Sequence, residues 1–509
     1  MSELLRTFFA REGGARDFIS TAAGGATDGE VCTMARRVAS RLGAATSPGE
    51  RVALFVSPGP TFLAAFFGAL AAGRVVVVLS PLHPAPETTF FCEDAGVRTV
   101  LASRALLDMT APIAAGREVL VIEDVCEAPT DEAPADGAPA ELDAPPDTPA
   151  LQLYTSGTTG RPKGAVITHG NLAVQQRLVA EAWGFTRDDT LLHALPLHHM
   201  HGLAIALLTA VGAGARVRML DFTGRSFDAA RVWDEMRDAT VLMAVPSMYH
   251  RLFAAFDAAD SGTRARWAAA ARSLRLATSG SAALPVTLAE RWRELTGKIP
   301  LERFGMTEIG VGITNPLDGP RVPGHVGLPL PTVEARVVDD EGRDAASGEL
   351  WIRGPSVFAG YHARPEETAR AFAADPDGGA PWFRTGDTVT RNPDAGAHAP
   401  YRILGRTSVD ILKSGGYKLS ALEIEEALRE HPAVGEVAVV GVPDEAWGDR
   451  VVACVLTREP VSAEALREHT RARLAPYKIP KDFIFLDDLP RNPVGKVVKP
   501  ALVAKLRGG

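Results

Sequence analysis

Short apolar runs and longer helix-like stretches alternate along the first 330 residues of the chain. The runs are rich in β-branched residues and stand at 51–57, 74–80, 97–103, 118–124, 150–157, 240–246 and 274–280. The stretch "TFLAAFFGALAAG" at 61–73 lies between the first two runs and is apolar enough for a buried helix. Fully apolar strands that alternate with helices are typical of largely parallel sheets covered on both faces. The pattern predicts a large N-terminal α/β domain of stacked sheets.

The pattern changes after about residue 320. Strand-like runs there are punctuated by glycine, as in "GELWIRG" at 348–354, and predict a small β-barrel-like subdomain. From 411 to 509 the chain has an apolar periodicity of its own, which predicts a separate small α+β domain. Its helices are expected at 420–431 and 462–476, and its strands at 436–442, 450–457 and 483–488. The Ala-, Pro- and acid-rich segment 127–150 is predicted to be an exposed loop within the first domain.

The composition narrows the class of protein. With 46% hydrophobic and 23% charged residues, the 509-residue chain has a soluble, globular composition. A net charge of −8 argues against nucleic acid or an anionic membrane as a general partner. The four cysteines are far apart, so we expect neither a disulfide framework nor a zinc cluster. No apolar run reaches a membrane span and the first residues include several acids, so we expect a cytoplasmic protein, as a monomer or homodimer.

The densest group of functional residue types is "YTSGTTGRPKGAV" at 154–166. Its glycines let the backbone approach a phosphate, its hydroxyls donate hydrogen bonds and its lysine supplies charge. It differs from the common P-loop because Pro162 precedes the lysine and Gly164 replaces the magnesium-binding Ser or Thr. The predicted polyphosphate-binding residues are Thr155, Ser156, Gly157, Thr158, Thr159, Gly160 and Lys163.

Four further segments follow in a fixed order: "ERFGMTEIG" at 302–310, "TGD" at 385–387, "GRTSVDILKSGGYKLSALEIE" at 405–425 and "PRNPVGKV" at 490–497. Together with 154–166, they resemble the signature segments of the adenylate-forming superfamily, which includes acyl-CoA synthetases, adenylation domains and luciferases. The resemblance runs from about residue 50 to 500. It implies an N-terminal domain over 1–405, a hinge over 406–410 and a mobile C-terminal domain over 411–509.

The resemblance also implies the reaction and several roles. A carboxylate attacks the α-phosphate of ATP to give acyl-AMP and pyrophosphate, and a thiol then displaces AMP. Lys496 would be the catalytic lysine, Glu308 beside Thr307 would hold Mg²⁺, and Asp387 would accept the ribose hydroxyls. Taken alone, a lysine near the C-terminus or an acid in a loop would more often be a solvated charge. Further nucleotide contacts are expected from Glu302, Arg303, Phe304, Gly305, Met306, Arg402 and Arg406.

The acceptor of the acyl group is expected to be coenzyme A. The glycine-rich loop "KSGGYK" resembles the loop that enters the active site of relatives for the second step. Its glycines leave room for a pantetheine arm. Transfer to a separate carrier protein is the alternative. The predicted hinge and coenzyme A residues are Asp410, Lys413, Ser414, Gly415, Gly416 and Tyr417.

The identity of the acid depends on "VPSMYHRLFAAF" at 245–256. A helix starting at Pro246 puts Met248, Leu252 and Phe253 on one apolar face, with Arg251 beside it. On the wheel alone Arg251 is a solvated charge, but the resemblance places this helix at the acyl site. Arg251 and Arg321 would then bind a second carboxylate, since arginine pairs with carboxylates in a bidentate manner.

The acyl site is expected to be completed by His199, His201, Ser279, Gly280 and Ser281. Among adenylate-forming enzymes, "LPLHHMHGL", "VPSMYHRL" and "RVPGHVG" are most similar to malonyl-CoA synthetases. We therefore expect a malonyl-CoA synthetase that tolerates methylmalonate. The alternatives are another short-chain or dicarboxylic acyl-CoA ligase, or a free-standing adenylation enzyme.

Overall fold

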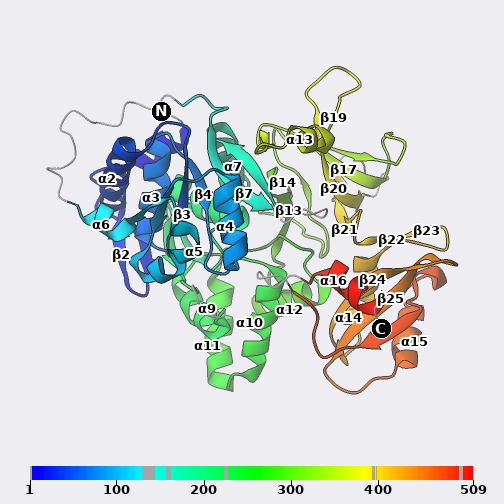
Figure 1. Ribbon diagram of the computed structural model, residues 1–509. Helices are drawn as coiled ribbons and strands as arrows, with labels where there is room; N and C mark the ends of the chain where they lie inside the picture. Colours follow the sequence, from blue (N-terminus) through cyan, green and yellow to red (C-terminus); the bar gives the residue numbers. More distant parts are fainter. Residues whose placement is uncertain are drawn as a thin grey trace.

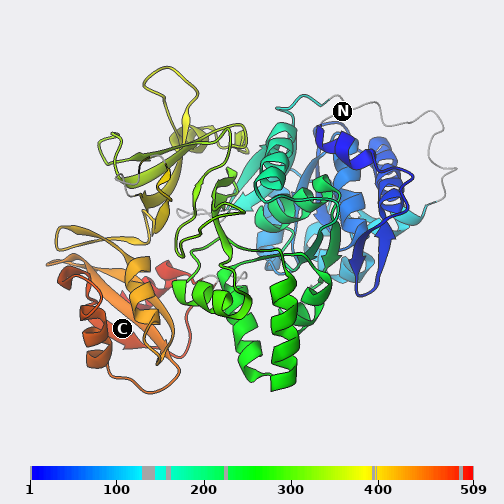
Figure 2. The same ribbon diagram turned by 180° about the vertical axis from the view of Figure 1, so that it is seen from behind.

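The computed structural model describes residues 3–128, 144–155, 162–222, 227–391, 396, 398–491 and 497–507. The N-terminal half forms the larger body and the C-terminal segment a smaller one beside it (Figure 1). In the view from behind, the C-terminal segment, orange to red, lies next to the green helices (Figure 2). None of the described helices is both long and apolar enough to cross a membrane.

The first sheet has seven strands in the order β18-β8-β7-β4-β3-β5-β6. In that order the strands are β18 (Gly360–Tyr361), β8 (Lys163–Thr168), β7 (Pro149–Thr155), β4 (Val75–Val78), β3 (Arg51–Phe55), β5 (Thr99–Ala102) and β6 (Glu118–Val121). The strands β7 to β6 run parallel, and β8 and β18 are antiparallel.

Helices cover both faces of this sheet, as the apolar runs predict. Val52 and Leu54 of β3 pack with α2 (Asp28–Ala45) and α3 (Pro60–Ala71), while Ala53 and Phe55 face the opposite core. That opposite core contains α4 (Ala85–Asp94) and the two short helices η1 (Arg104–Thr110) and α5 (Ala111–Ala114). A further helix, α6 (Ile122–Glu127), follows β6 and contacts α2. Successive strand residues point to opposite faces, so only an unbroken apolar run can serve two cores.

The second sheet has nine strands in the order β15-β14-β13-β12-β11-β9-β10-β1-β2. They are β15 (Leu328–Pro329), β14 (Gly310–Thr314), β13 (Leu301–Met306), β12 (Leu276–Ser279), β11 (Val241–Ala244), β9 (Thr190–His193), β10 (Arg216–Met219), β1 (Asp17–Thr21) and β2 (Gly24–Thr27). The strands from β13 to β1 are parallel, and β2, β14 and β15 are antiparallel. The predicted strands at 240–246 and 274–280 are confirmed as β11 and β12.

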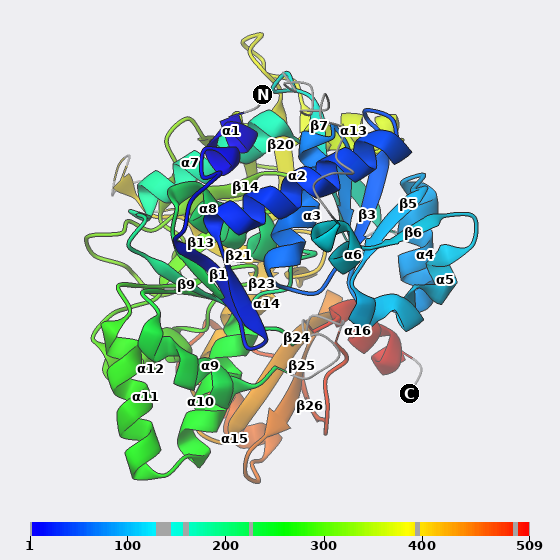
Figure 3. The same cartoon turned by 90° about the vertical axis from the view of Figure 1, so that its left-hand side faces the viewer.

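Helices also lie on both sides of the second sheet. The layer between the two sheets includes α2 and α3 together with α1 (Glu3–Phe9), α7 (His169–Ala182), the π-helix η3 (His201–Leu207) and α8 (Leu208–Ala213) (Figure 3). On the far side are α9 (Ala229–Glu235), η4 (Met236–Asp238), α10 (Pro246–Ala258), α11 (Ser261–Ser273) and α12 (Val286–Thr296). Stacked Trp233, Trp267 and Trp292 join these outer helices.

Helix α10 confirms the amphipathic helix predicted from the sequence. Pro246 occupies its first turn, where a missing N–H costs no hydrogen bond. Met248, Leu252 and Phe253 are buried. Arg251 lies beside this stripe and is exposed.

The glycine-punctuated segment forms the predicted small β subdomain. Its strands are β16 (Glu334–Val338), β17 (Ser347–Arg353), β19 (Phe372–Ala373), β20 (Trp382–Thr390) and β21 (Arg402–Arg406), with α13 (Pro365–Ala371) beside them. All the pairings are antiparallel. Among the described residues they form an open path from β16 to β19, with β21 on β20, and no pairing closes a barrel.

The C-terminal segment folds around cores of its own. Its sheet contains β22 (Ile411–Ser414), β23 (Tyr417–Ser420), β24 (Val434–Asp444), β25 (Gly448–Thr457) and β26 (Asp482–Phe485). The helices α14 (Ala421–Arg429) and α15 (Ala463–Arg471) pack in one core and α16 (Lys499–Arg507) in the other, with the one-turn η6 (Pro476–Lys478) leading into β26. The predicted helices and strands of this segment are confirmed, while the exact domain and hinge bounds stay predictions.

Candidate active site

The phosphate-binding stretch forms the tip of a hairpin. Thr155 ends β7 and Lys163 begins β8, directly opposite each other. The Lys163 ammonium lies 2.9 Å from a carboxylate oxygen of Glu367 in α13, and 5.3 Å from the centre of the Tyr361 ring. Ser156, Gly157, Thr158, Thr159 and Gly160, predicted to bind phosphate, lie outside the described residues.

Glu308 lies in the turn after β13 and is held by a residue that the sequence did not indicate. The Tyr361 phenol donates a 2.8 Å hydrogen bond to Oε1 of Glu308. Burial raises the pKa of Glu308, and the Tyr361 hydrogen bond and the charges of Arg406 and Lys163 oppose that rise. We call Lys163, Glu308, Tyr361, Glu367 and Arg406 the phosphate cluster. Thr307, next to Glu308, is partly exposed.

Two residues predicted from separate motifs face each other across β20 and β21. Asp387 and Arg406 are register partners, and Nε of Arg406 lies 3.3 Å from Oδ1 of Asp387. Nη1 of Arg406 also donates to the Thr385 carbonyl at 2.7 Å. Arg402 starts the same strand. The structure thus brings together the acid and the base that the motifs suggest for the ribose.

The phosphate cluster fits a metal that is shared with a nucleotide. Among the residues that the structure describes, no three His, Cys, Asp or Glu side chains are grouped to hold a metal ion. Glu308 offers one carboxylate, and Mg²⁺ commonly takes one or two carboxylates together with substrate phosphates and water. The donor set therefore suits Mg²⁺ carried by a triphosphate better than a metal held by protein alone.

The second cluster surrounds Arg303 of β13. Its guanidinium packs against Gly280, where a Cβ atom would come within 2.4 Å of Nε and 2.5 Å of Cζ. Arg303 is buried, and its Nε and Nη2 atoms have no hydrogen-bond partner in the described part of the chain. Burial lowers the pKa of Arg303 to about 10, so the side chain is still charged at neutral pH. An unpartnered buried cation is costly, which indicates a place for an anion.

His201, the first residue of η3, lies in the field of Arg303. Its Nδ1 is 3.1 Å from Oγ of Ser281, and its buried Nε2 has no partner among the described residues. Burial lowers the pKa of His201 well below its usual value, and the charge of Arg303 lowers it further, so the ring is neutral. Ser281 has a φ of 68°, a strained conformation for a side chain other than glycine.

We call His199, His201, Ser279, Gly280, Ser281 and Arg303 the acyl cluster. Within the described structure, Nε2 of His199 and Oγ of Ser279 are also buried without hydrogen-bond partners. Five of these six residues were predicted for the acyl site, and Arg303 was predicted for the nucleotide. The cluster gathers unsatisfied polar atoms of the kind that a small polar ligand would satisfy.

Glu302 and Arg303 point to opposite sides of β13, as neighbours in a strand must. Oε1 of Glu302 accepts a 2.8 Å hydrogen bond from the Gly324 N–H, and burial raises the pKa of Glu302 to about 8. This carboxylate supports a loop. Its contact with a nucleotide stays a prediction, as do those of Phe304, Gly305 and Met306 at the end of the strand.

The two arginines predicted to bind a second carboxylate make their contacts outside the acyl cluster. Arg321 donates to the backbone carbonyls of Pro316, Ile299 and Leu317, at 3.0, 2.7 and 2.5 Å. The Arg251 guanidinium lies 5.9 Å from the centre of the Phe227 ring. Neither arginine has a hydrogen bond or ion pair with the acyl cluster in the described structure, so their roles stay predictions.

The loop predicted to admit coenzyme A is a tight hairpin. Gly415 and Gly416 have φ of 57° and 82°, and both central residues of a type I′ turn need such values. Lys413 and Lys418 stand opposite each other across β22 and β23, while Ser414 pairs with Tyr417. Like charges in this position repel each other, and the Lys418 ammonium is paired with the Asp340 carboxylate.

Exposed aromatic residues accompany this hairpin. Tyr417 is 54% exposed and stacks on Tyr477 with ring centres 4.4 Å apart. Trp447 is 41% exposed, its ring centre lies 3.8 Å from the Lys481 ammonium, and its carbonyl accepts a hydrogen bond from the Gly415 N–H. The sequence reasoning missed Trp447, because a lone exposed tryptophan carries no motif.

Asp410, the predicted hinge residue, is fixed by ionic contacts. Nζ of Lys499 lies 2.6 Å from Oδ1 of Asp410 and 2.7 Å from Oε1 of Glu425. Oδ2 of Asp410 accepts a 3.0 Å hydrogen bond from the Arg406 N–H. The residue therefore joins the β21 strand to α16. Lys496, the predicted catalytic lysine, lies outside the described residues.

The doubly covered sheets, the paired Asp387 and Arg406, and the two clusters joined by β13 are features of an α/β enzyme. The model of the AMP-binding enzyme family matches residues 10–362, and that of the AMP-binding enzyme C-terminal domain matches residues 423–496. The chain belongs to the AMP-binding enzyme family.

Individual relatives are similar over nearly the whole chain. The mitochondrial malonate–CoA ligase ACSF3 of Mus musculus is 40% identical over 496 residues, covering 90% of this chain and 82% of the relative. ATP-bound MatB from Rhodopseudomonas palustris is 34% identical with a TM-score of 0.86, covering 100% of this chain and 99% of that one. A malonyl-CoA ligase solved with methylmalonyl-CoA and AMP is 39% identical with a TM-score of 0.66, covering 94% and 97%.

Proposed function

We propose that the chain is an ATP-dependent malonate–CoA ligase. It would convert malonate and ATP to malonyl-AMP and pyrophosphate, and then convert malonyl-AMP and coenzyme A to malonyl-CoA and AMP. The observation that carries the proposal is buried Arg303, with two unpartnered nitrogen atoms beside neutral His201 and Gly280. An acetyl or fatty acyl chain carries no charge that could pair with a buried cation. The second carboxylate of a dicarboxylic acid could pair with it.

The names of the relatives agree with a short dicarboxylic acid as the substrate. The similar enzymes of mouse and of Rhodopseudomonas span nearly the whole chain, so the acyl site is within the compared region. Methylmalonate adds one methyl group, a difference worth about 1–3 kcal/mol in a hydrophobic pocket. We therefore expect methylmalonate to be used as well, at lower efficiency.

In the first step, a malonate carboxylate oxygen attacks the α-phosphorus and the bond to pyrophosphate breaks. Both reactants are anions, so the protein's task is to position them and to offset charge. Lys163 would pair with the phosphates once they displace Glu367. Lys496 would bridge the carboxylate and the α-phosphate. Glu308 would hold Mg²⁺, which would supply positive charge to offset that of the phosphates. Asp387 and Arg406 would orient the ribose.

In the second step, the coenzyme A sulfur attacks the acyl carbon and AMP leaves. The Gly415–Gly416 turn has no side chains that would block a pantetheine arm, and Lys413, together with Lys418 once it leaves Asp340, would offer charge for phosphates. An exposed indole such as Trp447 is suited to stacking on a purine base. This surface favours free coenzyme A over a carrier protein.

The proposal includes the organisation predicted from the sequence. An N-terminal domain over 1–405 would bind ATP and malonate, and residues 406–410 would act as the hinge of a mobile domain over 411–509. The Asp410–Lys499 pair would have to move with that domain. A cytoplasmic location and a monomeric or homodimeric state complete the proposal.

Labelled pyrophosphate exchange into ATP tests the first step. We would compare malonate, methylmalonate, oxalate, succinate, acetate and benzoate, and then follow thioester formation with coenzyme A. Malonate should give the highest kcat/KM, followed by methylmalonate. Faster exchange with acetate or benzoate would refute the dicarboxylate assignment, and exchange without thioester formation would favour a carrier protein as acceptor.

A further inference from the structure

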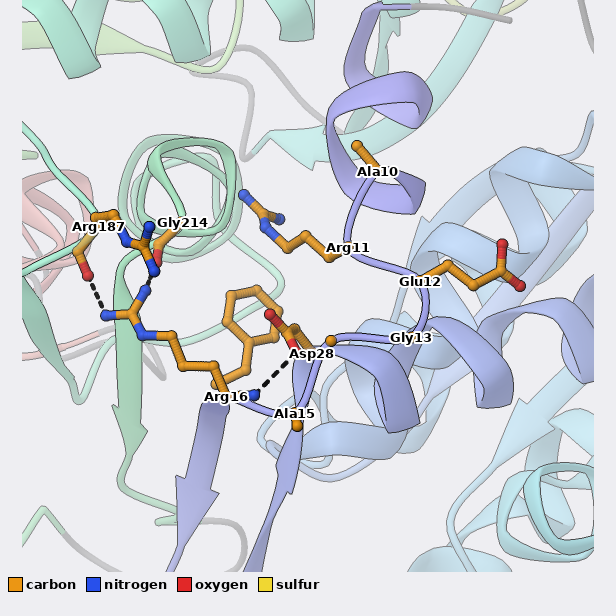
Figure 4. Close-up of a pocket in the computed structure, with 11 residues that line it drawn as sticks. Ala10, Arg11, Glu12, Gly13, Ala15, Arg16, Asp28, Arg187 and Gly214 are labelled. Atoms are coloured by element: carbon orange, nitrogen blue, oxygen red, sulfur yellow. Dashed lines mark hydrogen bonds between the residues drawn. The ribbon is translucent and has the colours of Figure 1, made fainter.

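A cavity of about 570 Å³ lies outside both clusters, where the N-terminal segment meets the end of α8 (Figure 4). It is lined by residues 10–16, Phe18, Asp28, Arg187 and Gly214. None of these residues belongs to the phosphate cluster or the acyl cluster. The lining contains three arginines, Arg11, Arg16 and Arg187, which come from two segments far apart in the sequence.

Part of this charge has a structural use. Nη2 of Arg11 donates to the carbonyls of Val211 and, at 3.2 Å, Gly212, and Nη1 of Arg16 donates to the Gly214 carbonyl at 2.8 Å. These carbonyls belong to the C-terminal end of α8, whose dipole favours cations. One side of the Arg11 guanidinium and one side of the Arg16 guanidinium therefore cap the C-terminal end of α8.

The remaining donor groups of these arginines do not cap a helix. Nη1 of Arg11 is buried without a hydrogen-bond partner among the described residues. The exposed Arg187 side chain makes no hydrogen bond or ion pair within the part of the chain that is described, and its carbonyl accepts from Arg16. Burial lowers the pKa of Arg11, the Asp28 carboxylate partly opposes this, and the charge of Arg16 lowers the pKa further, so the two cations are close enough to repel each other.

The acids near the cavity do not balance these charges. Glu12 points out of the cavity in Figure 4 and pairs with Arg36 at 2.5 Å. Asp28 faces inward, and its Oδ1 accepts from the N–H groups of Gly29 and Arg16 at 3.0 and 3.3 Å. Three arginines against one inward carboxylate leave two positive charges, which a dianion would neutralise.

We propose that this cavity binds a phosphate monoester. A monoester carries up to two negative charges near neutral pH, and its oxygens match guanidinium donors. The contacts would come from Nη1 of Arg11 and from the side chains of Arg16 and Arg187. The cavity is far larger than one phosphate group, so the organic part of the ligand would occupy the remaining space beside Gly13 and Ala15.

Isothermal titration of the full chain tests the proposal. The probes are glycerol 3-phosphate, inorganic phosphate and glycerol, each added in the presence of saturating AMP to occupy the nucleotide site. The variant is Arg187→Ser, which removes a side chain without internal contacts. The matched control is Arg264→Ser, since Arg264 is also exposed and has no side-chain hydrogen bond or ion pair among the described residues.

The wild type and Arg264→Ser should bind glycerol 3-phosphate with equal affinity, and Arg187→Ser at least tenfold more weakly. Binding should also weaken below about pH 6, where a monoester loses its second charge. Equal binding by Arg187→Ser, or none by the wild type, would overturn the site. Inorganic phosphate that binds as tightly as glycerol 3-phosphate would overturn the assignment to a monoester.

Discussion

Replacing Arg303 by methionine tests whether a buried cation selects the acid. Methionine fills similar space without charge, and the guanidinium is the cation that packs directly against Gly280. Removing one partner of a buried, hydrogen-bonded charge pair costs about 2–5 kcal/mol. At about 1.4 kcal/mol per factor of ten, kcat/KM for malonate should fall by roughly 30- to 4,000-fold. The KM for ATP should change little, because the phosphate cluster stays intact.

Pyrophosphate exchange measures both quantities in one assay, with malonate varied at saturating ATP and then the reverse. Arg303→Lys is the conservative variant and should lose less, since the charge is kept and only the planar fork is lost. Propionate, which has malonate's length but one carboxylate, should gain relative to malonate in Arg303→Met.

Arg321→Met is the matched comparison. Its guanidinium donates to three backbone carbonyls, so the change should lower the melting temperature and cost malonate less than Arg303→Met does. An equal loss for malonate would support the sequence-based prediction that Arg321 binds the second carboxylate. The reasoning fails if Arg303→Met activates malonate normally. An equal rise in the KM for ATP would instead restore Arg303 to the nucleotide, where the motif alone had placed it.

The remaining predictions concern the neighbours of these clusters. Gly280→Ala puts a Cβ 2.4 Å from Nε of Arg303, so the KM for malonate should rise at least tenfold while the KM for ATP stays the same. Unchanged kinetics with malonate would mean that Arg303 can move aside freely. Tyr361→Phe removes the 2.8 Å hydrogen bond to Glu308, at a cost of about 1 kcal/mol. Pyrophosphate exchange should therefore slow about fivefold and need more Mg²⁺. An unchanged Mg²⁺ titration would contradict this role. Burial raises the pKa of Glu302 to about 8, so the folded state binds a proton that the unfolded state releases, and stability should fall as the pH rises from 6.5 to 8. Urea unfolding should show a slope of up to about 1.4 kcal/mol per pH unit from this group near pH 6.5, which declines towards pH 8 and is absent in Glu302→Gln; the same slope in both proteins would refute it.

The strands of the sheets could be predicted because they are buried on both faces. An apolar run such as "RVALF" has to satisfy two cores, and that requirement leaves a mark in the sequence whatever its neighbours are. The small β subdomain was predicted less well. Its strands alternate in burial, and whether such a sheet closes depends on pairings between distant segments that local patterns do not carry.

The roles along β13 could not be read from the motif. "ERFGMTE" places seven residues near a nucleotide, but adjacent side chains on a strand point to opposite sides. Glu302 therefore supports the loop at Gly324 while Arg303 enters the acyl cluster. Tyr361 was missed for a different reason. It lies 53 residues from Glu308, on a two-residue strand that reaches the site only by pairing with β8.

One stretch of backbone sets the spacing between the acid and the phosphate. Arg303 lies within β13 and Glu308 in the turn that follows, so they are at most about 17 Å apart along an extended chain. This turn is held from behind: Oε1 of Gln175 accepts the Val311 N–H at 2.9 Å, and Gly310, with φ of 67°, leaves no room for a side chain against it. If the nucleotide binds at the phosphate cluster as proposed, this turn would keep the guanidinium at a constant distance from the α-phosphate. Under the proposed function, the length of the diacid would then be read against the backbone, because one carboxylate has to reach Arg303 while the other reaches the α-phosphate.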